Sequence, residues 1–77
     1  MHTFKKGEKV AVINQTIGGR FMVEGTATVV RTIRDLDESY VVEFADGQRC
    51  QRFIDPAAQV DPAAFVETLN TPRAAHG

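Results

Sequence analysis

The 77-residue chain is long enough for one small domain with a thin core, and its single cysteine excludes an internal disulfide framework and a cysteine-based zinc site. Nine basic and ten acidic residues give a net charge of -1, which argues against a strongly basic, non-specific nucleic-acid coat. The chain has no apolar signal core and no run close to the ~20 apolar residues of a membrane span, so we expect a soluble, cytoplasmic protein without a membrane partner.

Two β-patterned runs open the chain. The β-branched run from Val10 to Ile13 predicts a first strand. A second, longer strand is expected from about Met22 to Arg34, with Ala27 and Val29 facing inward. Gly25 interrupts this long run and indicates a bulge or bend, which a strongly curved sheet needs.

The segment between these strands, residues 14–21, is expected to be a loop. Gly18 and Gly19 are adjacent in it and no sustained period is present. Glycine N–H groups can cradle a phosphate, but no helix is predicted to follow, so a turn is the preferred interpretation. The loop also offers Ile17, Arg20 and Phe21 to a protein partner.

A hairpin follows the turn expected at residues 35–38. Residues 40–45 alternate apolar and polar with an aromatic core face, which is typical of a half-buried strand. Asp46-Gly47 predicts a tight primed turn because it provides positive φ at low cost. Residues 48–54 then return as the next strand.

The tetrapeptide Asp-Pro-Ala-Ala occurs twice, at residues 55–58 and 61–64. In each copy the aspartate can cap a helix start and the proline can occupy the first helical position. We expect the first copy to form one short helical turn, with Val60 closing the barrel. The second should begin a helix from Pro62 to about Asn70.

The predicted fold is mainly all-β, a small barrel with a short C-terminal helix. Its expected parts are the barrel at residues 1–60, the helix at 61–70, and a disordered tail at 71–77. Phe65 and Leu69 lie one turn apart and are expected to dock the helix on the barrel.

The turn and core positions resemble those of the SH3-like small barrels, including KOW and Tudor-type modules, over residues 4 to about 60. The matching patterns are Gly7-x-x-Val10-x-Val12, Gly25-x-Ala27-x-Val29 and Tyr40-x-Val42-x-Phe44-x-Asp46-Gly47. This resemblance implies a five-stranded barrel. It says little about activity, since small barrels serve many functions.

Three segments, residues 4–10, 25–44 and 51–58, are also similar in spacing to the plasmid type II dihydrofolate reductases, which are tetramers around one pore. The resemblance implies a pore wall at residues 50–53, where Cys-Gln-Arg-Phe stands in place of the family's Val-Gln-Ile-Tyr. It also implies that Arg34 would hold the anionic ligand. Arg52 would add four copies of a charge to such a pore.

Groupings for conventional catalysis are not evident. Ser39 lies beside a turn, and His2 and His76 lie near the two ends of the chain. A catalytic triad or a metal site would need both ends to fold back, so no catalytic residue, metal or cofactor is expected. Cys50 has arginine neighbours that could make it reactive, but a small core cysteine is the preferred interpretation.

An alternating stripe on the last strand is the best binding candidate. Arg49, Gln51 and Phe53 share one face, where they could stack a base or grip a peptide. The alternative is that Phe53 is core and the two polar residues only face water. Arg31 and Arg34 could extend the stripe. The candidate binding residues of the whole chain are therefore Arg20, Phe21, Arg31, Arg34, Arg49, Gln51 and Phe53.

Three functions remain open from the sequence. The first is a non-enzymatic binding module that contacts a protein partner or itself. The second is a nucleic-acid-binding barrel, whose affinity would fall steeply with salt. The third is a tetrameric pore enzyme of the reductase kind.

Overall fold

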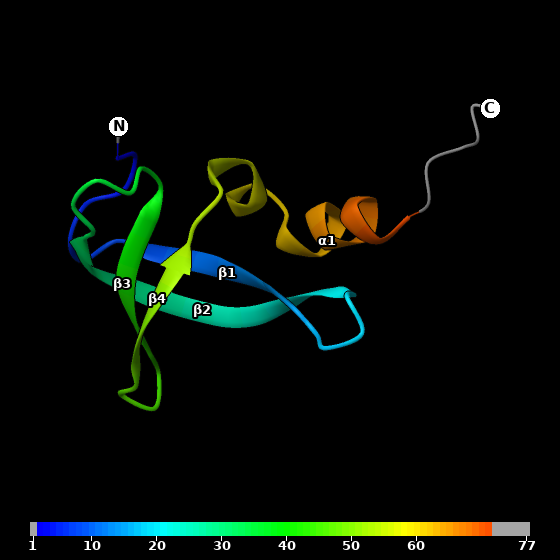
Figure 1. The fold of residues 1–77 in the computed structure, drawn as a ribbon, viewed down its shortest axis with the longest axis horizontal. Helices are drawn as coiled ribbons and strands as arrows, with labels where there is room; N and C mark the ends of the chain where they lie inside the picture. The colour runs from blue at the N-terminus through cyan, green and yellow to red at the C-terminus, as the bar shows by residue number, and fades with distance from the viewer. Residues whose placement is uncertain (1, 72–77) are drawn as a thin grey trace.

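The computed structural model describes residues 2–71. Four antiparallel strands form one sheet in the order β1-β2-β3-β4, so the chain is mainly β with one short C-terminal helix (Figure 1). The elements in chain order are β1 (Lys9–Gln15), β2 (Phe21–Thr32), β3 (Ser39–Phe44), β4 (Arg49–Phe53), the 3-10 helix η1 (Pro56–Gln59) and α1 (Pro62–Asn70).

The sheet of residues 2–71 is not closed by a fifth strand. Val60, which was expected to close a barrel, is 91% exposed. The physical reason is that the two Asp-Pro helix starts leave only Val60 and Asp61 between η1 and α1, which is too short for a strand.

The outer edge of β1 is instead met by one side chain. The Gln59 carboxamide accepts a hydrogen bond from the Ala11 N–H at 2.7 Å and donates to the Ala11 carbonyl at 3.0 Å. An edge strand presents unpaired backbone groups, and here a carboxamide satisfies one donor and one acceptor.

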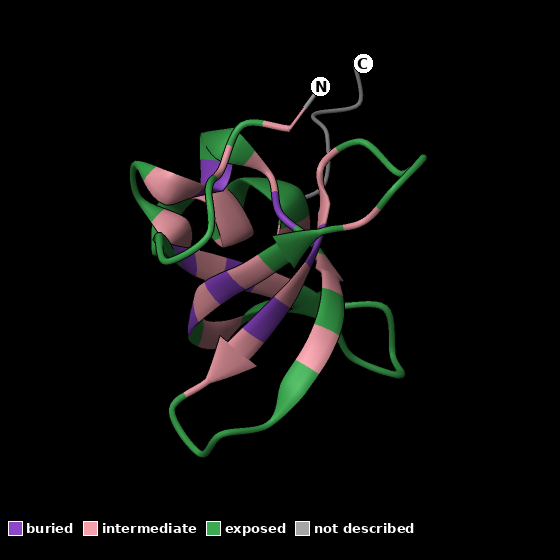
Figure 2. Cartoon of the chain, turned by 90° about the vertical axis from the view of Figure 1, so that its left-hand side faces the viewer, coloured by how far each residue is buried: buried purple, intermediate pink, exposed green. Residues whose placement is uncertain are grey.

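The core lies on one face of the sheet, as the alternating patterns predict (Figure 2). Tyr40 is fully buried, and its hydroxyl accepts hydrogen bonds from the N–H groups of Thr3 and Phe4 at 2.8 and 3.1 Å. The N-terminal segment is thereby fixed across the core. The buried side chains are Val10, Val12, Ala27, Val29, Tyr40, Val42, Ile54 and Ala58.

The predicted bend of β2 is confirmed. The register with β1 shifts where Val12 pairs with Gly25 and Ile13 pairs with Val23, so Glu24 is an extra residue. Gly25 has φ of +155°, which other residues rarely adopt. Because β3 pairs with β2 only from Ala27 onwards, the β1–β2 hairpin projects beyond the rest of the sheet.

Helix α1 is fastened to this projecting hairpin. The predicted cap forms, since the Asp61 carboxylate accepts a hydrogen bond from the Ala64 N–H at 3.2 Å. At the other end the Asn70 carboxamide donates to the Phe21 carbonyl and accepts from the Phe21 N–H, both at 2.8 Å. Asn70 therefore positions α1 with the same kind of contact that Gln59 makes with β1, in which one carboxamide bonds both backbone groups of a strand residue.

The predicted disordered tail covers residues 71–77, of which 72–77 lie outside the described residues. Thr71 ends α1 as its C-cap, and its N–H donates to the Glu67 carbonyl at 3.0 Å. In the described part of the chain, no helix combines the length and the apolar character that crossing a membrane requires.

Candidate functional site

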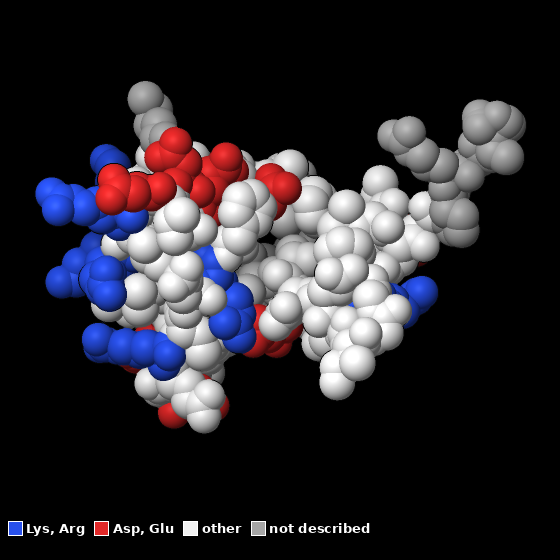
Figure 3. Space-filling model, viewed as in Figure 1, with Lys and Arg blue, Asp and Glu red and all other residues white. Residues whose placement is uncertain are grey.

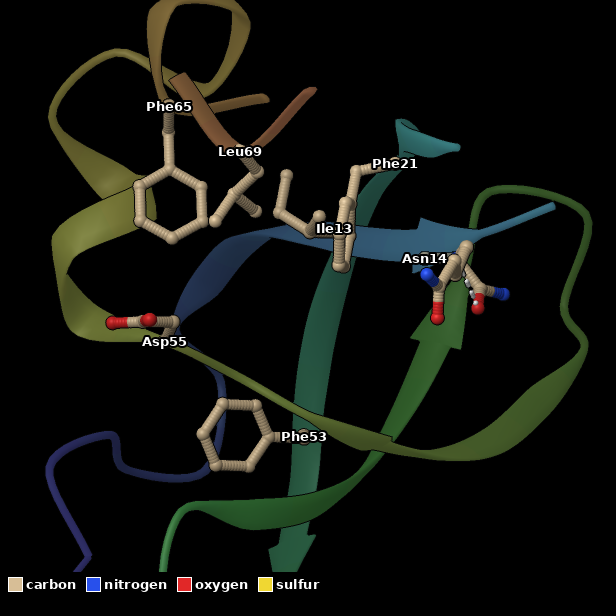
Figure 4. Close-up of a pocket in the computed structure, with 8 residues that line it drawn as sticks. Ile13, Asn14, Phe21, Phe53, Asp55, Phe65 and Leu69 are labelled. Carbon is tan, nitrogen blue, oxygen red and sulfur yellow. Dashed lines mark hydrogen bonds between the residues drawn. The ribbon is translucent and has the colours of Figure 1, made fainter. Parts of the chain in front are cut away.

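A groove of about 330 Å³ lies between α1, the projecting hairpin and the end of β4 (Figure 4). The lining is mainly apolar and aromatic, with a few polar groups at its margins. The residues that line it are Ile13, Asn14, Gln15, Phe21, Phe53, Asp55, Phe65 and Leu69.

Each wall of the groove follows from the local fold. Phe65 and Leu69 are one turn apart on α1, which the Asn70 contact holds against the hairpin. Ile13 and Phe21 lie with them along one wall, and Phe53 lies apart from them across the groove (Figure 4). The groove is therefore built by three elements that are distant in sequence.

Phe53 is not a core residue. It lies opposite Ser39, whereas the neighbouring Arg52 lies opposite the buried Tyr40. Directly opposed residues of antiparallel strands project to the same face, so Phe53 belongs to the solvent face of the sheet. Its side chain is 58% exposed, which leaves an aromatic ring at the margin of the groove.

The register also places three polar candidates on the solvent face. Arg31 of β2 lies opposite Val41 of β3, and Val41 lies opposite Gln51 of β4. Arg49 is on this face too, where its guanidinium donates to the Glu43 carboxylate at 2.8 Å. The structure thus brings Arg31, Arg49, Gln51 and Phe53 onto one surface.

The other three candidates lie elsewhere. Arg34 follows the end of β2, outside the paired strands. Arg20 lies in the β1–β2 turn, and Phe21 is half-buried where it lines the groove. Arg20 and Phe21 therefore belong to the groove end of the molecule, far along β2 from Arg31.

Charge is distributed unevenly over the surface. Figure 3 shows lysine and arginine gathered at the end of the molecule opposite α1, beside a group of acidic side chains. The basic residues near this end of β2 include Lys5, Lys6, Lys9, Arg31 and Arg34, and none of these five forms an ion pair within residues 2–71. The half that contains α1 shows few charges on the same face.

Sequence reasoning missed an ion pair on the core side of the sheet. The Arg52 guanidinium donates to both carboxylate oxygens of Glu24 at 2.8 Å, and Asn14 donates to the same carboxylate at 3.1 Å. The hydrogen bonds from Arg52 hold the pKa of the Glu24 carboxyl below its usual range, although partial burial opposes the shift. The bulge in β2 is what turns Glu24 toward β4.

Replacing Glu24 with glutamine is expected to cost about 1 kcal/mol of unfolding free energy at neutral pH, because the pair is partly exposed. A carboxyl whose pKa is lowered in the folded state stabilises above its unfolded pKa, and this stabilisation is lost as the pH falls through the folded pKa. The unfolding free energies of the wild type and the variant, measured by urea denaturation from neutral to acidic pH, should therefore converge at low pH. Glu43→Gln, at the more exposed pair with Arg49, is the matched control and should change little. A difference in unfolding free energy between the wild type and Glu24→Gln that stays constant at all pH values would contradict this account.

The residues implied by the reductase resemblance lie on β4 and near the end of β2. Gln51 is exposed on the solvent face, Cys50 is half-buried on the core face as a free thiol, and Arg34 is exposed. Within the described residues, no group of three or more His, Cys, Asp or Glu side chains could hold a metal ion.

Comparison with known proteins found no matching protein family, curated protein or solved structure. What the molecule binds must be inferred from its own surfaces.

Proposed function

We propose that this chain is a non-enzymatic binding module that acts through protein–protein contacts at the groove beside α1. The observation that supports this proposal is the combination of an apolar groove with one aromatic side chain, Phe53, left in solvent at its margin. Large exposed apolar surfaces on a small domain mark contact sites for other proteins. A cytoplasmic location is part of the proposal and is supported by the single free thiol, Cys50.

The proposal also takes the sheet to be an SH3-like small barrel in which the fifth strand is replaced by η1. Three features support this interpretation: the antiparallel order of the four strands, the sharp bend of β2 at Gly25, and the contact of Gln59 with the free edge of β1. Such barrels leave their loops and one sheet face available for binding.

The chemistry of the groove defines what it should bind. Its aromatic and aliphatic walls favour a large apolar side chain as an anchor, and desolvated anchors of this kind dominate the energy of protein interfaces. Asp55 lines the groove without an ion pair in the described part of the chain. A cationic group next to the anchor would therefore be favoured.

Selection of a random peptide library on the intact chain should enrich peptides that share one aromatic or large aliphatic residue near a lysine or arginine. Binding of a selected peptide should shift the amide and side-chain NMR signals of Phe21, Phe53 and Leu69. Phe53→Lys should weaken binding at least about tenfold, since it replaces an anchor contact with a charge.

Leu36→Lys is the matched control, because Leu36 is also an exposed apolar residue but lies in the turn between β2 and β3. It should leave peptide binding unchanged. Enriched peptides without a common apolar anchor would contradict the proposal. So would NMR signal shifts confined to the basic residues at the end of the molecule opposite α1.

Nucleic-acid binding is the second candidate, favoured by one specific observation. Arg31, Arg49 and Gln51 share the solvent face with the exposed ring of Phe53, and Arg31 has no anionic partner within residues 2–71. Cations beside an exposed aromatic ring are typical of surfaces that stack single-stranded bases. Binding of an oligonucleotide that falls steeply between ~50 and ~200 mM salt would favour this candidate over the protein partner.

A further inference from the structure

We propose that the groove of one copy receives the β1–β2 turn of a second copy, with Ile17 as the anchor, in a reciprocal twofold dimer. This inference rests on the proposed function and names the partner of the same site. The juxtaposition behind it is an apolar projection at the tip of the hairpin and an apolar groove beside that tip.

Ile17 occupies an unusual place for an apolar residue. It follows Thr16 in a tight turn, and its side chain is fully exposed. This turn joins β1 and β2 at the tip of the hairpin, which projects beyond the rest of the sheet (Figure 1). Turn tips in contact with water favour glycine, asparagine, aspartate and serine. An isoleucine at this position gains stability only when another surface covers it.

The turn holds Ile17 in a fixed position. Its backbone closes through hydrogen bonds from the Gly19 N–H to the Thr16 carbonyl and from the Thr16 N–H to the Arg20 carbonyl, both 2.8 Å. The Gln15 side chain adds a bond to the Gly19 carbonyl at 2.7 Å, and Gly19 has φ of +88°. A turn ordered before binding loses less conformational entropy when it docks.

The groove fits this turn in size and in charge. A volume of about 330 Å³ is that of about ten water molecules, enough for the four carbons of an isoleucine side chain. Arg20 follows Ile17 in the same turn and has no ion pair within the described residues, and Asp55 in the groove has none either. The docked turn would place the Arg20 guanidinium near the Asp55 carboxylate of the other copy.

A twofold dimer satisfies both sites at once. In such an interface, residue i of one copy meets residue j of the other and the reverse contact is equal. Two hairpins that lie antiparallel and overlap at their tips bring each tip to the groove beside the other tip, where Ile13 and Phe21 line the groove. The exposed side chains of Val23 on the hairpin, which shares the face of Phe21, and of Leu69 on α1 are then covered as well.

The test is sedimentation velocity of the intact chain from about 1 to 500 μM, a range that spans moderate to weak dimers. The wild-type chain should form a reversible dimer of twice 8.5 kDa. Ile17→Asn should raise the dissociation constant at least about tenfold, and asparagine suits the turn, so the monomer should remain folded. Phe53→Lys should have a similar effect from the other side of the contact, and Arg20→Gln a smaller one.

Leu36→Asn is the control, since it removes another exposed apolar side chain at the other end of the molecule and should leave the dimer intact. A wild-type monomer at every concentration, a dimer that Ile17→Asn does not weaken, or open polymers in place of a dimer would each overturn the inference. If the chain is monomeric but selected peptides still bind the groove, the second-copy proposal fails and the proposed function stands. If neither peptides nor a second copy bind there, both fail.

Discussion

Replacing Tyr40 with alanine is expected to lower the unfolding free energy by about 3–5 kcal/mol, the range for removing a large buried side chain. Tyr40 is the largest fully buried residue, and its ring makes edge contacts with His2 and Phe4 at centroid distances of 5.2 and 5.7 Å. A domain with so small a core has a total stability of similar size. The variant should therefore be largely unfolded by circular dichroism.

Tyr40→Phe measures the contribution of the hydroxyl to stability separately from that of the ring. It keeps the buried volume but leaves the N–H groups of Thr3 and Phe4 without their acceptor, so we expect a loss of about 1–2 kcal/mol. Val41→Ala is the control, because Val41 is the next residue on β3 and only half-buried. Equal effects of Tyr40→Ala and Val41→Ala would contradict the central place of Tyr40 in the core.

Gln59→Glu is expected to lower the unfolding free energy by about 2–3 kcal/mol at neutral pH, because the Gln59 carboxamide makes three hydrogen bonds. The Gln59 amide donates to the carbonyls of Ala11 and Asp55 at 3.0 and 3.1 Å, and a carboxylate oxygen at that place would face two carbonyl oxygens. Protonation would restore a donor, so the variant should recover part of the loss as the pH falls. Chemical denaturation at neutral and acidic pH measures both effects.

Gln48→Glu is the control for this substitution. Gln48 lies in the exposed turn between β3 and β4, so the same change of charge should alter stability by less than about 0.5 kcal/mol. Similar losses for the two variants would show that net charge, and not the contact with the edge of β1, governs the effect.

The sheet could be predicted because its signals are local. The alternation in β1, β2 and β3 identifies the core face correctly at Val12, Val29 and Val42. Asp46-Gly47 predicts the hairpin, but the turn is not the primed type. Only Gly47 has positive φ, and the Gly47 N–H bonds the Phe44 carbonyl in a three-residue loop.

The contacts that shape the groove could not be predicted in the same way. Gln59 bonds Ala11 across 48 residues, and Asn70 bonds Phe21 across 49. Both are polar side chains outside the strands, and no periodicity distinguishes them from surface residues. The expected fifth strand fails because only Val60 and Asp61 lie between η1 and α1, and the Gln59 carboxamide bonds the edge of β1 instead.

The seven candidate residues show the same division between local and long-range information. Period-two alternation places Arg49, Gln51 and Phe53 on one face, and the strand register extends that face to Arg31. The groove depends on where α1 docks, which the sequence expresses only as the Phe65 and Leu69 spacing. The sequence therefore predicts Phe21 to be an exposed loop residue, whereas it is half-buried as part of a groove wall.

The most direct test of the account is an isotope-filtered NOE experiment on a mixture of labelled and unlabelled chains, which detects only contacts between copies. We predict intermolecular NOEs from the methyl groups of Ile17 to the ring protons of Phe53 and Phe65. Two results would contradict the assignment of the groove as the contact site. One is intermolecular NOEs only among residues at the end of the sheet opposite α1, without any from Ile17. The other is the absence of intermolecular NOEs at concentrations where the chain is dimeric.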